Sequence, residues 1–153
     1  MISRGVGGFS RTRAAAAAAA VVTVVAGLGI RALVDGCVAK YAGDALYAVL
    51  ILALVVFVAP RSRPVAAAGV ALGFSWAVEL LQLTGVPAEL GRRSAIAHLV
   101  LGSTFNAPDL VWYAVGAALG WCVHGLLVRR SGRPAVSSRS DLARREGLAR
   151  RGV

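Results

Sequence analysis

Eight polar or charged residues stand at or near the ends of apolar stretches, where membrane proteins often place ligand-binding or proton-transfer groups. Carboxylates, an amide and guanidinium groups can hydrogen-bond hydroxyls or hold a phosphate, and a carboxylate beside a histidine can move protons. No nucleophile and base stand at a recognised catalytic spacing, and no His or Cys spacing predicts a metal site or a cofactor. Besides His98, the residues are the candidate ligand-binding set Asp44, Glu79, Gln82, Arg92, Arg93, Asn106 and Asp109.

Glu79 is the most informative member of this set. By helical rise it lies about 6 Å before Leu83 in an apolar stretch, where an ionised carboxylate without a partner costs up to a few kcal/mol. No helix cap needs an acid there, so we expect an ion pair with Arg92 or Arg93, or a functional role. Ser75 and Gln82 share its helical face and extend a polar stripe.

Simpler roles exist for three of the other candidates. Asn106 can be the N-cap of a helix, with Asp109 three residues later as the acid of a capping box. Gly43-Asp44 is typical of a helix start, so Asp44 can also be a cap. His98 is either a solvated loop residue or an assistant to a carboxylate base, and these alternatives stay open.

The elements that position these residues are apolar helices. The chain is 58% hydrophobic and 16% charged, outside the usual range of a soluble domain. Four apolar stretches are long enough to cross a hydrocarbon core of about 30 Å. We therefore predict an all-α polytopic membrane protein with spans at about 14–30, 44–59, 65–83 and 109–128. Residues 1–13 would be a basic N-terminus, 14–128 the membrane domain and 129–153 a disordered tail.

The basic residues predict an orientation. Thirteen flank one side of the predicted spans and four the other, so the positive-inside rule places both termini in the cytoplasm of a plasma (inner) membrane. The basic tail is expected to bind anionic lipid, and it lacks the aromatic or polar readers of a nucleic-acid binder. Cys37, in a predicted loop, and Cys122, in the last span, are too far apart for a disulfide.

Two pairs of glycines predict helix packing. Gly116 and Gly120 lie on the face of the last span that leads to Asp109, and Gly69 and Gly73 mark a second face that could support a homo-oligomer. Tyr41 and Tyr47 are expected at the membrane interface. The segment 84–108 is too long for a plain turn, and part of it is expected to form a short surface helix.

Several of these motifs together resemble a known family. Three motifs resemble those of small bacterial four-helix membrane proteins catalogued as a domain of unknown function. They are Gly43-Asp44, Glu79-Leu-Leu-Gln82, and Leu101-Gly-Ser-Thr-Phe-Asn-Ala-Pro-Asp109 before Gly116 and Gly120. The resemblance covers roughly residues 14–128, although that family often has an acid where this chain has Asn106. The Glu-x-x-Gln and the acid before a Gly-rich helix are also distantly similar to VanZ-like proteins, which implies a link to the cell envelope.

These observations favour a membrane protein with an outward-facing polar pocket between the third and fourth spans, which binds an envelope lipid or glycan head group. One alternative is an intramembrane enzyme that uses Glu79 or Asp109 as a base. Another is a helix-packing scaffold or subunit of a larger membrane complex. The composition and spacing predict the setting of the protein but do not name its ligand.

Overall fold

The chain folds into helices only, in the part that the structure describes. The computed structural model describes residues 3–102 and 104–131, and the side chains of residues 10–102 and 104–130. The elements are α1 (Ser3–Leu33), α2 (Cys37–Val58), α3 (Pro64–Leu81), the short 3₁₀ helix η1 (Gln82–Thr84), α4 (Val86–Arg93), α5 (Ala95–Leu101) and α6 (Ala107–Ser131). The predicted all-α fold is confirmed.

Four of these helices can cross a membrane. Apolar spans of 21 to 24 residues lie at Ser10–Leu33, Cys37–Val58, Pro64–Thr84 and Ala107–Arg130, and at 1.5 Å per residue each is about 30 Å or more in length. Large apolar side chains such as Val22, Val58 and Val111 remain exposed on them. In hydrocarbon these side chains meet lipid, so the protein is a multi-pass membrane protein.

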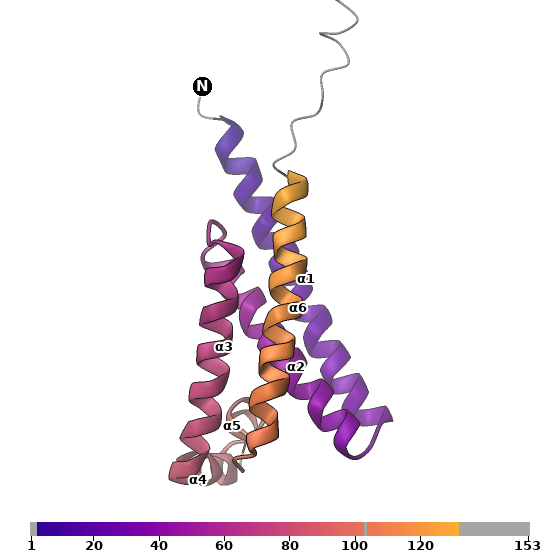
Figure 1. The fold of residues 1–153 in the computed structure, drawn as a ribbon, viewed down its shortest axis with the longest axis vertical. Helices are drawn as coiled ribbons and strands as arrows, with labels where there is room; N and C mark the ends of the chain where they lie inside the picture. Colours follow the sequence, from indigo (N-terminus) through magenta and orange to yellow (C-terminus); the bar gives the residue numbers. More distant parts are fainter. Residues whose placement is uncertain (1–2, 103, 132–153) are drawn as a thin grey trace, which may run out of the picture.

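Helix α2 is the centre of the bundle. It packs against α1, α3 and α6, and α3 also packs against α6. The N-terminal end of α1 and the C-terminal end of α6 lie at one end of the bundle, while α4 and α5 lie at the other (Figure 1). This arrangement brings the start of α2, the end of α3 and the start of α6 together.

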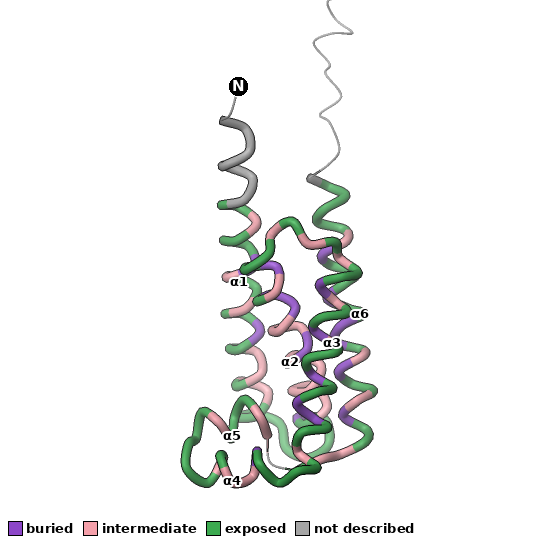
Figure 2. Tube along the Cα trace, turned by 90° about the vertical axis from the view of Figure 1, so that its left-hand side faces the viewer, coloured by how far each residue is buried: buried purple, intermediate pink, exposed green. Residues whose placement is uncertain are grey.

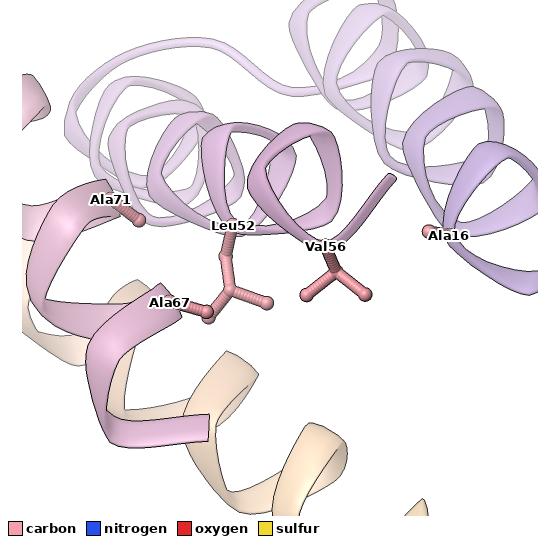
Figure 3. Close-up of a cluster of buried hydrophobic side chains, with 5 residues drawn as sticks. All are labelled: Ala16, Leu52, Val56, Ala67 and Ala71. Atoms are coloured by element: carbon pink, nitrogen blue, oxygen red, sulfur yellow. The ribbon is translucent and has the colours of Figure 1, made fainter. Parts of the chain in front are cut away.

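The buried side chains form two small apolar clusters. In the first, Leu52 and Val56 project from α2 between Ala67 and Ala71 of α3 and Ala16 of α1 (Figure 3). The second, nearer to α4 and α5, joins Ala48, Tyr113 and Ala117, with Tyr47 and Leu72 against it. Buried positions therefore follow the inner faces of α2, α3 and α6 (Figure 2).

Glycines set the distance between α2 and α6. A Cβ atom on Gly116 would lie 2.1 Å from the Ala45 carbonyl oxygen, and one on Gly120 would lie 2.7 Å from Leu52 Cδ1. The Ala45 backbone cannot move aside for a side chain at Gly116, whereas the end of the Leu52 side chain can shift at Gly120. Both contacts show that the predicted packing face of α6 is occupied by α2. Gly69 and Gly73 differ, because they are exposed and an added Cβ would touch no described atom. They take no part in packing within the described part of the chain.

Helix α2 begins earlier than predicted. Its first residue is Cys37, so Asp44 lies inside the helix rather than at its start, and the prediction of a cap at Asp44 is wrong. Polar residues such as Lys40 suggested a loop, but in the helix Lys40 and Asp44 are one turn apart and form an ion pair. Cys37 is accordingly an exposed helical residue, and both cysteines are free.

The segment between α3 and α6 contains two short helices, α4 and α5. Pro87 lies in the first turn of α4, and the Ser94 hydroxyl accepts a hydrogen bond from the Ala97 N–H at the start of α5. Gly91 allows α5 to approach, since a Cβ there would lie 3.1 Å from His98 Nδ1. The expected helical structure is therefore present, as two helices instead of one.

Candidate functional site

Six polar side chains from α2, α3 and α6, with the residue just before α6, form one connected group at the end of the bundle that carries α4 and α5. We call this group the polar network. Its members are Lys40, Asp44, Glu79, Asn106, Asp109 and Tyr113. The predicted site lay between the third and fourth spans, and the structure adds the second span to it.

Glu79 is the most buried member of the polar network, with 1% of its surface exposed. The Asn106 backbone N–H donates to Oε1 over 2.6 Å, and the Tyr113 hydroxyl donates to Oε2 over 3.2 Å. Each carboxylate oxygen therefore has a neutral donor, and these two bonds tie α3 to the start of α6. A hydrogen-bonded acid is far less costly at this depth than a bare one.

Asp109 lies beside Glu79 and has 4% of its surface exposed. Its Oδ2 pairs with the Lys40 ammonium, and its Oδ1 accepts from Asn106 Nδ2 over 2.5 Å. The same ammonium lies 3.7 Å from Asp44 Oδ2. Lys40 thus joins two acids, and its side chain is 46% exposed, which places it at the rim of the site.

The start of α6 differs from the predicted capping box. Asn106 does stand immediately before the first helical residue, Ala107. In a capping box the acid three residues on would accept from the backbone N–H of the cap, but that N–H donates to Glu79. Asp109 instead binds the Asn106 side chain and Lys40. The acid that the sequence assigned to a local cap is used to hold α2 against α6.

Arg92 and Arg93 are not partners of Glu79. Both bind Glu89, which lies three and four residues before them on α4, and Arg93 Nη2 is 2.8 Å from Glu89 Oε1. Their side chains are 74% and 76% exposed. The predicted ion pair is wrong because a local helical partner was available. His98 is exposed on α5, where it packs beside Gly91.

Gln82 braces the loop before α6. Its Nε2 donates to the Leu101 carbonyl over 2.7 Å. Gly102 follows with φ +65°, a backbone angle that favours glycine, and a Cβ there would lie 2.6 Å from Gln82 Nε2 and push the Gln82 amide aside. Gln82 is therefore placed next to the polar network through the loop, and not as one of its members.

Aromatic side chains flank the polar network. Tyr41 stacks on Trp112 with ring centroids 5.3 Å apart, and Tyr47 lies 6.0 Å from Tyr113 in a tilted pair. The Trp76 indole N–H donates to the Leu110 carbonyl over 3.0 Å, a further link between α3 and α6. Tyr47 was expected at the membrane interface, but it packs inward against Tyr113.

Four buried polar atoms near the polar network have no hydrogen-bond partner among the described residues. They are Asp44 Oδ2, Tyr47 OH, Ser75 Oγ and Gln82 Oε1. Ser75 is fully buried and stands one helical turn from Glu79 on α3. Native proteins pair nearly all buried polar atoms, so this set has unused hydrogen-bonding capacity.

Comparison with known proteins assigns the chain to a family. The family model described as "Protein of unknown function (DUF2809)" matches residues 33–117, more than half of the chain. The chain belongs to this family. The DUF2809 match runs from the end of α1 to the middle of α6 and contains all six residues of the polar network. No curated protein and no solved structure matches the chain.

This result confirms the predicted membership in a family of unknown function, while the similarity to VanZ-like proteins stays a prediction. The DUF2809 description carries no activity that could be transferred to Glu79 or Asp109. Among the described residues, no group of three or more His, Cys, Asp and Glu side chains is placed to hold a metal ion.

Two network members were missed by sequence reasoning. Lys40 was counted only as a basic residue, although it is the single lysine in the sequence and stands four residues before Asp44. Tyr113 lies between Asp109 and Gly116 on the predicted packing face of α6, and its hydroxyl also donates to Glu79. The Lys40–Asp44 spacing was a usable signal, while the Tyr113–Glu79 contact needed the packing of α3 on α6.

Proposed function

We propose that this protein binds the polar head group of an envelope lipid or glycan at the outer end of its membrane domain, in a bacterial inner membrane. The proposal rests on four buried atoms that have no hydrogen-bond partner in the described part of the chain, and they belong to Asp44, Tyr47, Ser75 and Gln82. A head group with hydroxyl or amine groups can supply the missing partners. The exposed Lys40 at the rim supports access from the membrane surface.

The outward orientation belongs to the same proposal. The polar network comes from the start of α2, the end of α3 and the start of α6. These helix ends lie opposite the N-terminal end of α1 and the C-terminal end of α6 (Figure 1). The positive-inside rule places Arg11, Arg13, Arg129 and Arg130 in the cytoplasm, which leaves the polar network outside. The rest of the basic tail, 132–153, lies outside the described residues, so its disorder and its binding to anionic lipid stay predictions.

A labelling experiment tests the orientation. Cys37 is exposed at the start of α2, at the same end as the polar network. A membrane-impermeant maleimide is therefore expected to label right-side-out vesicles and to leave inverted vesicles unlabelled. Cys37→Ser is the control, and it should abolish the signal because Cys122 lies in the interior of a span. The reverse pattern would place the site in the cytoplasm and contradict an envelope ligand.

A second experiment tests head-group binding. Tyr47→Phe with Ser75→Ala removes two hydroxyls that have no hydrogen-bond partner among the described residues, so the double variant should be as stable as the wild type or more stable. If the hydroxyls contact a ligand, retention of the copurified lipid or glycan should fall about tenfold, from two hydrogen bonds of roughly 0.5–1.5 kcal/mol each. Native mass spectrometry measures retention, and thermal unfolding in detergent measures stability.

Ser62→Ala is the matched control for this experiment. Ser62 also has a buried hydroxyl without a partner among the described residues, but it lies in the turn between α2 and α3, at the other end of the bundle. Its removal should leave retention unchanged. Equal retention by the wild type and by the Tyr47→Phe/Ser75→Ala variant would reject head-group binding at this site.

The homo-oligomer prediction also remains a proposal. Gly69 and Gly73 form an exposed small-residue face on α3 that could accept a helix of another chain. This face lies apart from the polar network, so oligomerisation and head-group binding are independent hypotheses.

A further inference from the structure

The formal charges of the polar network are unbalanced. It contains three carboxylates, those of Asp44, Glu79 and Asp109, against the single ammonium of Lys40. Lys40 binds Asp109 directly and lies 3.7 Å from Asp44. Glu79 is bound by two neutral donors. The site therefore has an excess of negative charge, and a guest with positive charge would reduce it.

Arg92 and Arg93 do not reduce the negative charge of the polar network. The sequence suggested that Arg92 and Arg93 could clamp a phosphate in the site, but both bind Glu89 on the exposed surface of α4. An anionic group placed beside Glu79 and Asp44 would meet carboxylates instead of guanidinium groups. Like charges at short range disfavour such a ligand.

The four buried atoms that lack a hydrogen bond among the described residues define what the guest must offer, and one of them, Asp44 Oδ2, already lies 3.7 Å from the Lys40 ammonium. Gln82 Oε1 can accept hydrogen bonds but not donate them, and the same holds for Asp44 Oδ2 when Asp44 is ionised. The Tyr47 and Ser75 hydroxyls can accept or donate. All four atoms can thus be satisfied by N–H or O–H donors. A primary ammonium has three donors and a positive charge, whereas a trimethylammonium has the charge without the donors.

We propose that the bound head group carries a primary ammonium, and that it is the zwitterionic phosphoethanolamine group of an outer-leaflet lipid. Its ammonium donates to Asp44 Oδ2, which has an ion pair with Lys40 but no hydrogen bond among the described residues. Its phosphate lies outside the polar network, at the membrane surface. The acyl chains extend along the exposed apolar surface of the spans, near residues such as Val38 and Val111. This inference rests on the proposed head-group binding and specifies the ligand.

The test compares three lipids with identical acyl chains on the full-length wild-type protein. Phosphatidylethanolamine has the ammonium, phosphatidylcholine replaces its three N–H donors by methyl groups, and phosphatidylglycerol offers hydroxyls without a cation. Native mass spectrometry from mixed micelles is expected to show phosphatidylethanolamine retained about tenfold more than either competitor, because hydrogen bonds to a charged group are worth roughly 1.5–3 kcal/mol. No substitution is needed for this comparison.

A pair of variants then locates the ammonium. Asp44→Asn removes one negative charge and should lower phosphatidylethanolamine retention about tenfold, by the same charge-assisted bonds. Glu89→Gln is the matched control, since it removes an acid at the same end of the molecule that binds only Arg92 and Arg93 among the contacts described. It should leave retention unchanged.

The outcomes separate the two proposals. Equal retention of phosphatidylcholine would refute the requirement for N–H donors. Preferential retention of phosphatidylglycerol, lost in the Tyr47→Phe/Ser75→Ala variant, would overturn the ammonium but keep a head-group site. If no lipid distinguishes that variant from the wild type, head-group binding itself fails. Strong retention of phosphatidylethanolamine by the Asp44→Asn variant would show that the ammonium does not bind Asp44, and it would overturn the inference.

Discussion

Replacing Glu79 by alanine is expected to lower the free energy of unfolding by about 2–6 kcal/mol. The substitution leaves two buried donors without an acceptor, the Asn106 backbone N–H and the Tyr113 hydroxyl, at roughly 1–3 kcal/mol each. Glu79→Gln should cost only about 1 kcal/mol, because the amide oxygen can accept from Asn106 while the amide nitrogen donates to the Tyr113 oxygen. Thermal and denaturant unfolding in the same detergent compares the variants.

A double-mutant cycle separates the two bonds of Glu79. Tyr113→Phe removes one donor, so it should reduce the loss caused by Glu79→Ala by about 1–3 kcal/mol. Removal of Arg93 is the control, since Arg93 binds Glu89 and should restore nothing to either Glu79 variant. A Glu79→Ala protein as stable as the wild type would show that the two hydrogen bonds do not hold α3 against α6.

Enlarging Gly116 is expected to separate α2 from α6. In Gly116→Ala the new Cβ would lie 2.1 Å from the Ala45 carbonyl oxygen and 2.9 Å from Ala45 Cα, so the backbone must shift. Overpacking of this kind costs about 1–3 kcal/mol, and more when a rigid backbone is in the way. Because α2 carries Lys40 and α6 carries Asp109, the same shift should weaken their ion pair and lower lipid retention.

Gly125→Ala is the matched control on the same helix. An added Cβ there meets no described atom, and alanine is favoured over glycine in a helix by up to about 1 kcal/mol. This variant should be as stable as the wild type or slightly more stable, with unchanged lipid retention. If Gly116→Ala and Gly125→Ala behave alike in unfolding and in retention, the close approach of α2 and α6 is not required for the fold or the site.

The membrane character of the protein was readable from the sequence because hydropathy is a property of each segment by itself. Four apolar stretches of sufficient length predicted the four spans, and their centres needed no knowledge of the contacts between them. The packing face of α6 was also predictable, since Asp109, Gly116 and Gly120 recur at helical spacing. The start of α2 could not be predicted in this way. Lys40 and Asp44 are polar, and their pairing inside a helix depends partly on Asp109 of another span.

The partners of Glu79 were decided only by the tertiary structure. Asn106 and Tyr113 are 27 and 34 residues away in the chain, and they reach Glu79 because α3 and α6 cross at this depth. The sequence offered Arg92 and Arg93 as nearer cations, but Glu89 binds them locally within one helical turn. Charge and spacing along the chain therefore indicated that a buried acid needs partners. Which donors meet it depends on how α3 packs against α6. The glycines of α6 set a different distance, the one between α6 and α2, which brings Lys40 to Asp109.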